Sequence, residues 1–477
     1  MLRFEVVAMR TVTPRSLVWI AILVISAGCA APPRSDSSVA LTAPHLRPVE
    51  EIDRHGSPPV VQTSQSTPVL QIGRDLTATT LTADNLVVLV LERNPTLEQM
   101  TAAAAAAAAR YPQVVSLDDP VVAFQTSPLS AGSPNADYAA RVELSQKIPL
   151  YGKRKLRGRA ALAEARAVAQ DIDDARLQLV EAANAALADY ALAEQSLGVA
   201  AESTRLLRDF RQNAETRYRN GLAPQQDILQ LDVEAVRLEE RTVSLRRARQ
   251  VARARINALA HLPADGPLPP PADLRPAVPL PDAAELRRRA VASRPDMLAL
   301  ADRLAAELAA LGLAHREYKP DVELLTAYDG YWQGAGGRPL QWQVGARVNL
   351  PFRTGRRDAA VSEAQAKIAA RRAELARLTD RVGFQVQEAY EQARESGQVV
   401  KLYEAKGVPA AEANVKEAQA AYVNGKVPLL SLVEAQRNLI AVRDRLNEAR
   451  AEAFRRRATL DRVVGVPAAA ATSGSVR

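Results

Sequence analysis

Histidine and cysteine, two residue types that carry much of enzyme chemistry, are few in this chain and lie far apart. The four histidines stand at no metal-ligand spacing (His45, His55, His261 and His315). The run Gly334-Ala335-Gly336-Gly337 lies between two predicted strands and not between a strand and a helix, so it is a loop and not a phosphate-binding turn. The sequence contains neither a nucleophile elbow nor a zinc-protease motif. We therefore predict no enzyme activity, no cofactor and no metal site.

The single cysteine, Cys29, is the residue best placed for chemistry of another kind. Basic residues precede an apolar run at 17–27, which is the pattern of an export signal and is too short to span a bilayer. Cys29 follows small residues, and this segment resembles the lipobox of bacterial lipoproteins, in which the cysteine sulfur carries diacylglycerol. The alternative is a plain signal peptide with an incidental cysteine. Both predict export from the cytoplasm.

Composition indicates long helices. Of 477 residues, 47% are hydrophobic but only 4% are aromatic, which suits helices that pack through small side chains. The net charge of +8 comes from 62 basic and 54 acidic residues that are intermixed along the predicted helices, so these helix faces are expected to be solvated. A basic stretch at 246–255 has no interleaved aromatic residues, and for an exported chain this argues against nucleic-acid binding.

The sequence contains an internal duplication. Asn220-Gly221 with Pro224 recurs as Asn424-Gly425 with Pro428, an offset of 204, and other pairs recur at offsets of 200 and 202. A nearly constant spacing of this kind indicates two copies of one structural unit. The predicted organisation is an export signal at 1–29, a flexible tether at 30–80, repeat 1 at 81–262, a proline-rich connector at 263–281, repeat 2 at 282–467 and a disordered tail at 468–477.

Each repeat is predicted to contain a helix (about 84–110 and 282–315), a β-hairpin (about 118–150 and 320–352) and very long helices that pair by heptads. Residues 150–223 contain no proline, and a mostly helical tract of that length would exceed ~90 Å. In the second copy Gly407-Val408-Pro409 interrupts the corresponding tract. A joint or bend is expected there.

The predicted strands alternate between apolar and polar residues. In 138–150 the even positions are mostly apolar, while the odd positions include Arg141, Glu143 and Lys147; segment 340–352 repeats the pattern with Arg347 on its polar side. Thirteen-residue strands suit a tilted bilayer crossing, and alternation of this kind suits the wall of a water-filled barrel. Four strands cannot close a barrel, so we expect several chains to share one. The alternative is a soluble sheet with one face on a core.

The export signal with its cysteine, the duplicated hairpin-and-helix unit and the Asn-Gly turns together resemble the TolC-like outer membrane efflux protein family, over about residues 80–467. The resemblance implies a mainly α fold with a membrane β-barrel: a homotrimer with a twelve-strand barrel in the outer membrane and a periplasmic α-barrel. It implies a lipid-anchored, passive exit duct for drugs or metal ions, working with a periplasmic adaptor protein and an inner-membrane pump of the resistance-nodulation-division type. The alternatives are a type I protein secretion duct and a periplasmic coiled-coil scaffold lipoprotein without a pore.

The resemblance also assigns residues. The family's gate acids match Asp227 and Glu434, whereas Ser431 stands where the family often has a further acid. Asp227 also suits a helix N-terminus in its own right. The polar strand residues Arg141, Glu143, Lys147 and Arg347 would line the barrel lumen. The adaptor-docking tips would be Tyr218, Arg219, Asn220, Gly221 and Leu222 in the first copy and Tyr422, Val423, Asn424, Gly425 and Lys426 in the second.

Overall fold

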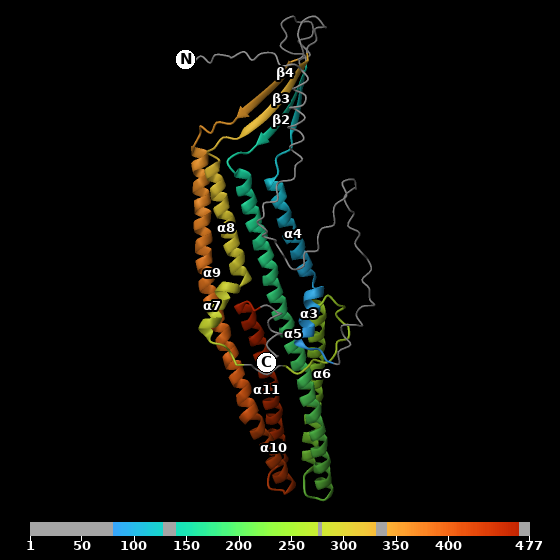
Figure 1. The fold of residues 1–477 in the computed structure, drawn as a ribbon. Coiled ribbons are helices and arrows are strands. Elements are labelled where there is room, and N and C mark those ends of the chain that lie inside the picture. The colour runs from blue at the N-terminus through green and yellow to red at the C-terminus, as the bar shows by residue number, and fades with distance from the viewer. Residues whose placement is uncertain (1–79, 127–139, 275–278, 331–340, 467–477) are drawn as a thin grey trace, which may run out of the picture. The chain divides into compact units, whose positions relative to one another are not determined.

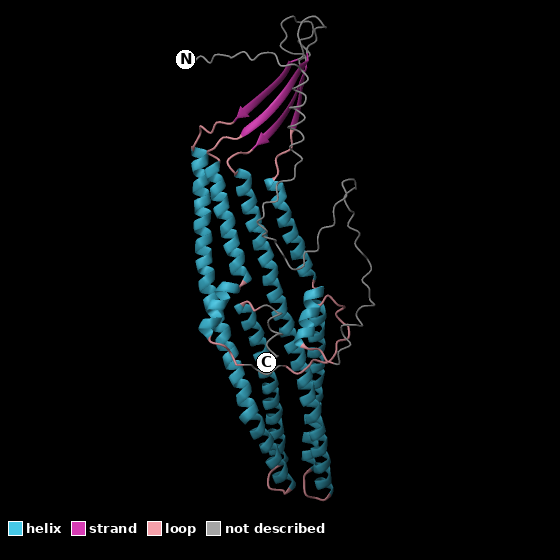
Figure 2. Ribbon diagram, viewed as in Figure 1, coloured by secondary structure: helices cyan, strands magenta, loops and turns pink. Residues whose placement is uncertain are grey.

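A computed structural model describes residues 80–126, 140–274, 279–330 and 341–466. These residues fall within one compact unit, Gln65–Arg477, and most of them are helical (Figures 1 and 2). The predicted export signal with Cys29, the tether up to residue 79, the Gly334 loop and the tail lie outside the described residues. None of the helices in the described ranges is both long and apolar enough to cross a bilayer.

The two repeats contain equivalent elements in the same order. Repeat 1 contains α3 (Ala83–Arg93), α4 (Pro95–Val115), β1 (Val121–Thr126), β2 (Ala140–Ile148), α5 (Lys153–Arg219) and α6 (Gln225–Leu259). Repeat 2 contains α7 (Ala283–Ser293), α8 (Pro295–Arg316), β3 (Val322–Gly330), β4 (Gln341–Val348), α9 (Gly355–Leu402), the π-helix η4 (Tyr403–Gly407), α10 (Val408–Val423) and α11 (Leu429–Val464).

The first helix predicted in each repeat is in fact two helices. The breaks fall at Asn94-Pro95 and Arg294-Pro295, and in both cases the proline occupies the first turn of the second helix. Proline has no N–H to continue the preceding helix and restricts the residue before it to extended backbone. Asn94 and Arg294 are extended accordingly, with ψ of 120° and 129°.

The long helical tracts differ between the copies. Helix α5 runs unbroken for 67 residues, about 100 Å at 1.5 Å per residue. In repeat 2 the π-helix η4 separates α9 from α10 and ends at Gly407, with Pro409 in the first turn of α10. The predicted joint is therefore present as a π-helical turn, which widens the helix locally without ending it.

Three hydrophobic clusters hold the helices together. One joins α5, α6, α10 and α11 and contains Phe210 and Leu432. The other two are equivalents of each other in the two repeats: Leu86 and Ile256 pack in one, Leu286 and Leu460 in the other.

Part of the proline-rich connector is pinned to the start of repeat 1. Leu81 N donates to Pro270 O (2.8 Å), and Ala272 N donates to Leu81 O (2.9 Å). These two bonds form a short parallel bridge between Leu81 and Pro271. The connector is therefore not a free linker over this stretch.

The four strands form one antiparallel sheet in the order β1-β2-β3-β4, so β2 and β3 join the two repeats (Figure 2). All four lie within the predicted hairpins. At their described ends, β2 stops at Ile148 and β4 at Val348, short of the predicted positions 150 and 352. Pro149 and Pro351 follow these ends, and proline cannot donate to a strand ladder.

Candidate functional site

One face of the sheet carries a network of charged residues. Arg141 forms a two-pronged ion pair with Asp329, with Nε–Oδ1 at 2.7 Å and Nη2–Oδ2 at 2.8 Å, and Gln343 Nε2 donates to the same carboxylate at 2.9 Å. Further along this face, Arg347 pairs with Glu323 at 2.9 Å and with Glu143 at 3.6 Å. Paired arginine forks fix both partners and leave the face polar.

The other face is apolar and is not covered by the described residues. Strand pairing places its side chains in cross-strand rows, for example Val142 beside Tyr328 and Tyr328 beside Trp342. Seven of its side chains are exposed: Val122, Phe124, Val142, Leu324, Trp342, Val344 and Val348, with Val344 at 79%. A soluble sheet normally buries its apolar face, and an apolar face this large marks an interaction surface.

The four predicted lumen residues all lie on the charged face. The register of β2, β3 and β4 brings Arg141, Glu143, Lys147 and Arg347 to the same side of the sheet, opposite the exposed apolar residues. The sheet is thus divided into two faces of opposite character, as the alternation in the sequence indicates.

At the far ends of the long helices, two glycine turns have the same geometry. We define tip 1 as residues 217–224 and tip 2 as residues 421–428. Gly221 and Gly425 both have φ of +71°. In tip 1 Gly221 N donates to Tyr218 O (3.0 Å) and Leu222 N to Arg217 O (2.8 Å), and tip 2 has the same two bonds at the equivalent positions. This is a Schellman cap, which requires a left-handed residue and so favours glycine. Pro224 and Pro428 then occupy the N-cap positions of the returning helices.

Three side chains tie tip 1 to tip 2. Arg217 Nη1 donates to Val423 O at 2.5 Å, and its guanidinium lies 5.1 Å from the centroid of the Tyr422 ring. The Tyr422 hydroxyl in turn donates to Asp227 Oδ2 at 3.0 Å. The pKa of Tyr422 is raised to about 12, mainly by burial and secondly by the hydrogen bond to Asp227. The hydroxyl therefore keeps its proton at neutral pH. We call Arg217, Tyr422 and Asp227 the tip cluster.

The predicted site residues thus divide by location. Asp227 lies in the first turn of α6 and belongs to the tip cluster, whereas Glu434 is exposed on α11. Tyr422 is only 3% exposed and packs in the core beneath its tip, so it presents no surface to a partner. The other tip residues named from the sequence are exposed: Tyr218, Arg219, Asn220, Gly221, Leu222, Val423, Asn424, Gly425 and Lys426.

Sequence reasoning placed Arg217 in the tip motif but did not predict its contact with the other tip, and it assigned no role to Glu234. Arg217 lies in the last turn of α5, next to a turn that recurs in the second repeat. This position was the signal from which a role in the tip could be predicted. Glu234, on α6, accepts from two guanidinium nitrogens of Arg437 on α11, one of them Nε at 3.0 Å, and from Arg237 at 2.7 Å. The bonds from Arg437 lower the pKa of Glu234 and keep it ionised. Glu234 and Arg437 belong to different repeats, so no local pattern reveals their pairing.

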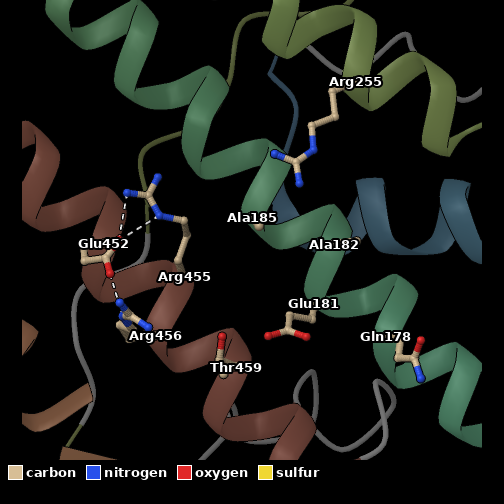
Figure 3. A pocket seen from close by; sticks show the side chains of 9 residues that line it. All are labelled: Gln178, Glu181, Ala182, Ala185, Arg255, Glu452, Arg455, Arg456 and Thr459. Atoms are coloured by element: carbon tan, nitrogen blue, oxygen red, sulfur yellow. Dashed lines mark hydrogen bonds and ion pairs between the residues drawn. The ribbon is translucent and has the colours of Figure 1, made fainter. Parts of the chain in front are cut away.

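A groove lies between α5, α6 and α11 (Figure 3). Its lining residues are Gln178, Glu181, Ala182, Ala185, Arg255, Glu452, Arg455, Arg456 and Thr459. Several of the charged ones are already paired, since Glu452 accepts from both Arg455 and Arg456, and Glu181 pairs with Arg462. The lining residues include no nucleophile that is hydrogen-bonded to a base. Within the described ranges, no group of three or more metal-ligating side chains is found either.

Solved structures with a similar fold include outer membrane channels. The outer membrane channel OprN has a TM-score of 0.66 at 21% identity, and the alignment covers 80% of this chain and 89% of OprN. The outer membrane protein VceC of Vibrio cholerae has a TM-score of 0.67 at 18% identity, over 80% of this chain and 96% of VceC. CusC, described as forming a transmembrane channel, has a TM-score of 0.67 at 16% identity, over 80% of this chain and 91% of CusC.

Comparison of the sequence with protein families agrees with the structural similarity. Residues 286–466, most of repeat 2, match the family model described as outer membrane efflux protein. No curated protein matches the sequence. The predicted resemblance to the TolC-like outer membrane efflux protein family is confirmed by the family match together with the fold.

Proposed function

We propose that the chain is the outer membrane channel of a tripartite efflux system, a passive exit duct for drugs or metal ions. The single observation that carries this proposal is the sheet, which exposes an apolar face on one side and an ion-paired charged face on the other. Lipid accepts the first face and a water-filled lumen the second. A sheet in lipid also cannot leave an open edge, because unpaired backbone groups are costly there.

Closure of the barrel requires more than one chain. Four strands are too few, and three chains would supply twelve, within the range of known barrels. The edge strands β1 and β4 would then pair with β4 and β1 of neighbouring copies. In this assembly Arg141, Glu143, Lys147 and Arg347 line the lumen, and the long helices continue the duct into the periplasm.

The tips form the gate and the docking rim of the proposed duct. The tip cluster holds tip 2 against tip 1, so opening requires the Tyr422–Asp227 and Arg217–Val423 bonds to break. Asp227 and Glu434 add negative charge near the aperture and favour cations there. The exposed tip residues would contact a periplasmic adaptor protein, whose binding replaces the bonds that hold the gate shut.

The partners and the membrane anchor are those that the resemblance to the TolC-like family implies. Energy comes from an inner-membrane pump, for which we favour the resistance-nodulation-division type. Cys29 anchors the chain to the outer membrane by lipid. The specificity for drugs or metal ions lies in the pump, because the wide, polar lumen of such a duct does not select its cargo.

Conductance in planar bilayers tests the proposal. Purified protein should insert and give discrete, cation-preferring channels, and Asp227→Ala combined with Glu434→Ala should weaken the cation preference, because the ring of charge is removed. The matched control replaces two exposed acids away from the tips, Glu92→Ala with Glu164→Ala, and should leave the preference unchanged. Well-folded trimers that never conduct would instead support a coiled-coil scaffold without a pore.

A further inference from the structure

Helix α6 has apolar residues on two opposite sides. One side, including Leu231, Ala252 and Ile256, is buried. The other consists of Leu229, Val233, Val236, Val243 and Val251, each between 54% and 65% exposed; we call these five residues the α6 outer stripe. At about 100° per residue, Val236 lies about 140° around the helix from Leu231 and Val243 about 120°. Nothing in the described part of the chain covers the outer stripe. A helix that is apolar on two sides packs between two neighbours.

The repeat shows what covers this side in the other copy. Helix α11 is the equivalent of α6 at the offset that relates the two tips, and the equivalents of Leu229 and Val236 are Val433 and Ile440. Both are buried, at 5% and 8% exposed. Helix α11 also faces α5 along its length, through the ion pairs Arg443–Glu202, Arg455–Asp189 and Arg462–Glu181. The end helix of repeat 2 therefore packs on the long helix of repeat 1.

The same contact is missing at the other edge of the chain. The equivalent of α5 in repeat 2 is the tract α9, η4 and α10. Within the chain this tract packs on α11 and leaves the α6 outer stripe exposed, so we look for the same tract on a second copy. On α10 the positions equivalent to the α5 surface carry small, exposed side chains, including Ala410, Ala413 and Asn414. Small residues allow two helices to approach closely.

Charge complementarity supports this pairing. Arg443 and Glu202 pair at 2.7 Å within the chain. Their equivalents at the offset that relates the two tips are Glu239, on α6, and Lys406, in η4. The signs are exchanged, but the pair is again one acid and one base. Glu239 and Lys406 are both exposed, and neither makes an ion pair with another described residue. Each would have its partner on a second copy.

We propose that the α6 outer stripe of one copy packs against η4 and α10 of the next copy, with Glu239 paired to Lys406 across the interface. The contact is head-to-tail, and a head-to-tail contact repeated by rotation closes a ring. The inference rests on the proposed function, because a closed duct needs a helical wall that is continuous between chains. It specifies the contact surface on α6, the segment of the next copy that covers this surface, and the register between the two helices.

Disulfide crosslinking tests the register. The Arg443–Glu202 pair places Ile440 of α11 beside the turn of α5 that contains Leu206. Val236 and Ala410 are the equivalents of Ile440 and Leu206, so cysteines at these two positions should lie on facing helices of neighbouring copies.

Oxidation of the double variant Val236→Cys with Ala410→Cys in membranes should give bands of two and three chain masses and none larger, because a ring of three is complete. Each single variant serves as the control and should add no such bands. Cys29, the one native cysteine, is present in all three.

Charge exchange provides a second measurement that does not depend on cysteine geometry. Glu239→Lys should raise the monomer fraction in detergent, Lys406→Glu should do the same, and the two together should restore the wild-type fraction. Glu92→Lys, which changes an exposed acid on α3, is the matched control and should change nothing.

The outcomes separate this inference from the proposed function. Folded trimers that neither crosslink nor respond to charge exchange overturn the interface but leave the duct intact. Folded protein that is monomeric in detergent and silent in bilayers overturns both. Crosslinked bands beyond three chain masses contradict the closed ring. If the chain's own amino-terminal segment covers the α6 outer stripe instead, the double-cysteine protein should stay monomeric, which overturns the interface.

Discussion

At the scale of single residues, the tip cluster shows how a few polar atoms hold two helical hairpins together. Arg217 belongs to α5 and Tyr422 to α10, so their contact joins repeat 1 to repeat 2. Tyr422 is buried, and its hydroxyl donates to Asp227. A hydrogen bond to a charged group contributes about 1.5–3 kcal/mol, which is enough to set the position of the proposed gate.

Tyr422→Phe should open the proposed gate. The ring stays beneath Arg217, but the bond to Asp227 is lost, and since about 1.4 kcal/mol is a factor of ten, the ratio of open to closed channels should rise about tenfold. Single-channel recording measures this ratio directly. Tyr111→Phe is the matched control, because Tyr111 is exposed on α4, and it should leave the ratio unchanged. Equal open fractions in both variants would show that the Tyr422–Asp227 bond does not hold the gate.

The pH dependence of the same bond follows from the raised pKa of Tyr422, about 12 against an ordinary value of 10.0. Because the pKa is higher in the folded state, the stabilisation is complete below about pH 10 and is lost as the pH rises through about 12. The difference in open fraction between Tyr422→Phe and the wild type should therefore be the same at about pH 7 and about pH 9. A difference that shrinks over this range in single-channel recordings would mean that another group holds the gate.

At the scale of elements, the turns are set locally and the joints are set by proline and the π-helix. Gly221 and Gly425 terminate their helices in the left-handed conformation, whereas Gly198 sits in the middle of α5. The same residue type therefore has opposite effects on stability in the two settings: it favours the cap and weakens the helix.

Gly221→Ala should destabilise tip 1 by about 1 kcal/mol, because an alanine side chain disfavours positive φ even though nothing lies within 4 Å of the new methyl group. Gly198→Ala, also in open space, should stabilise α5 by about 1 kcal/mol. Hydrogen exchange at the amides of tip 1 and thermal unfolding measure the two effects. A loss of stability of equal size in both variants would mean that backbone conformation is not the cause.

At the scale of the whole molecule, one sheet connects the two repeats and separates an apolar face from a charged one. The pairing of β2 with β3 brings Arg141 of repeat 1 to Asp329 of repeat 2. The ion pairs cover the polar side, and the apolar side is left for lipid in the proposed assembly.

Adjacent substitutions on β4 distinguish the two faces. Val344→Arg places a charge on the apolar face, at a cost of about 2–4 kcal/mol per chain at the bilayer midplane, so the amount of trimer in the outer membrane should fall sharply. Gln343→Arg places the same charge on the polar face, where Gln343 already bonds to Asp329, and should assemble normally. Quantification of trimer in membrane fractions checks both. Normal assembly of Val344→Arg would argue for a sheet that does not enter lipid.

Features of the fold that depend on a local pattern were predictable from the sequence. Alternation in β2 and β4 predicted the two faces and the Asn-Gly turns predicted the tips, because each of these patterns lies within a few residues. The recurrence of motifs at an offset of 204 predicted the order of the elements. The helix breaks at Pro95 and Pro295 also have a local cause, although the apolar pattern predicted one helix at each place. The strands end before the predicted positions because the alternation continues past the prolines that stop the pairing.

Contacts between residues that are distant in the sequence depend on the folded arrangement of the helices. Tyr422 looked like a surface tip residue but is buried, since α10 packs against α5, α6 and α11. Glu234 meets Arg437, and Asp227 meets Tyr422, across helices whose relative register no local pattern encodes. The α6 outer stripe became evident only when its burial could be compared with that of α11. Contacts between helices depend on how whole surfaces fit, and that fit is decided only when the chain has folded.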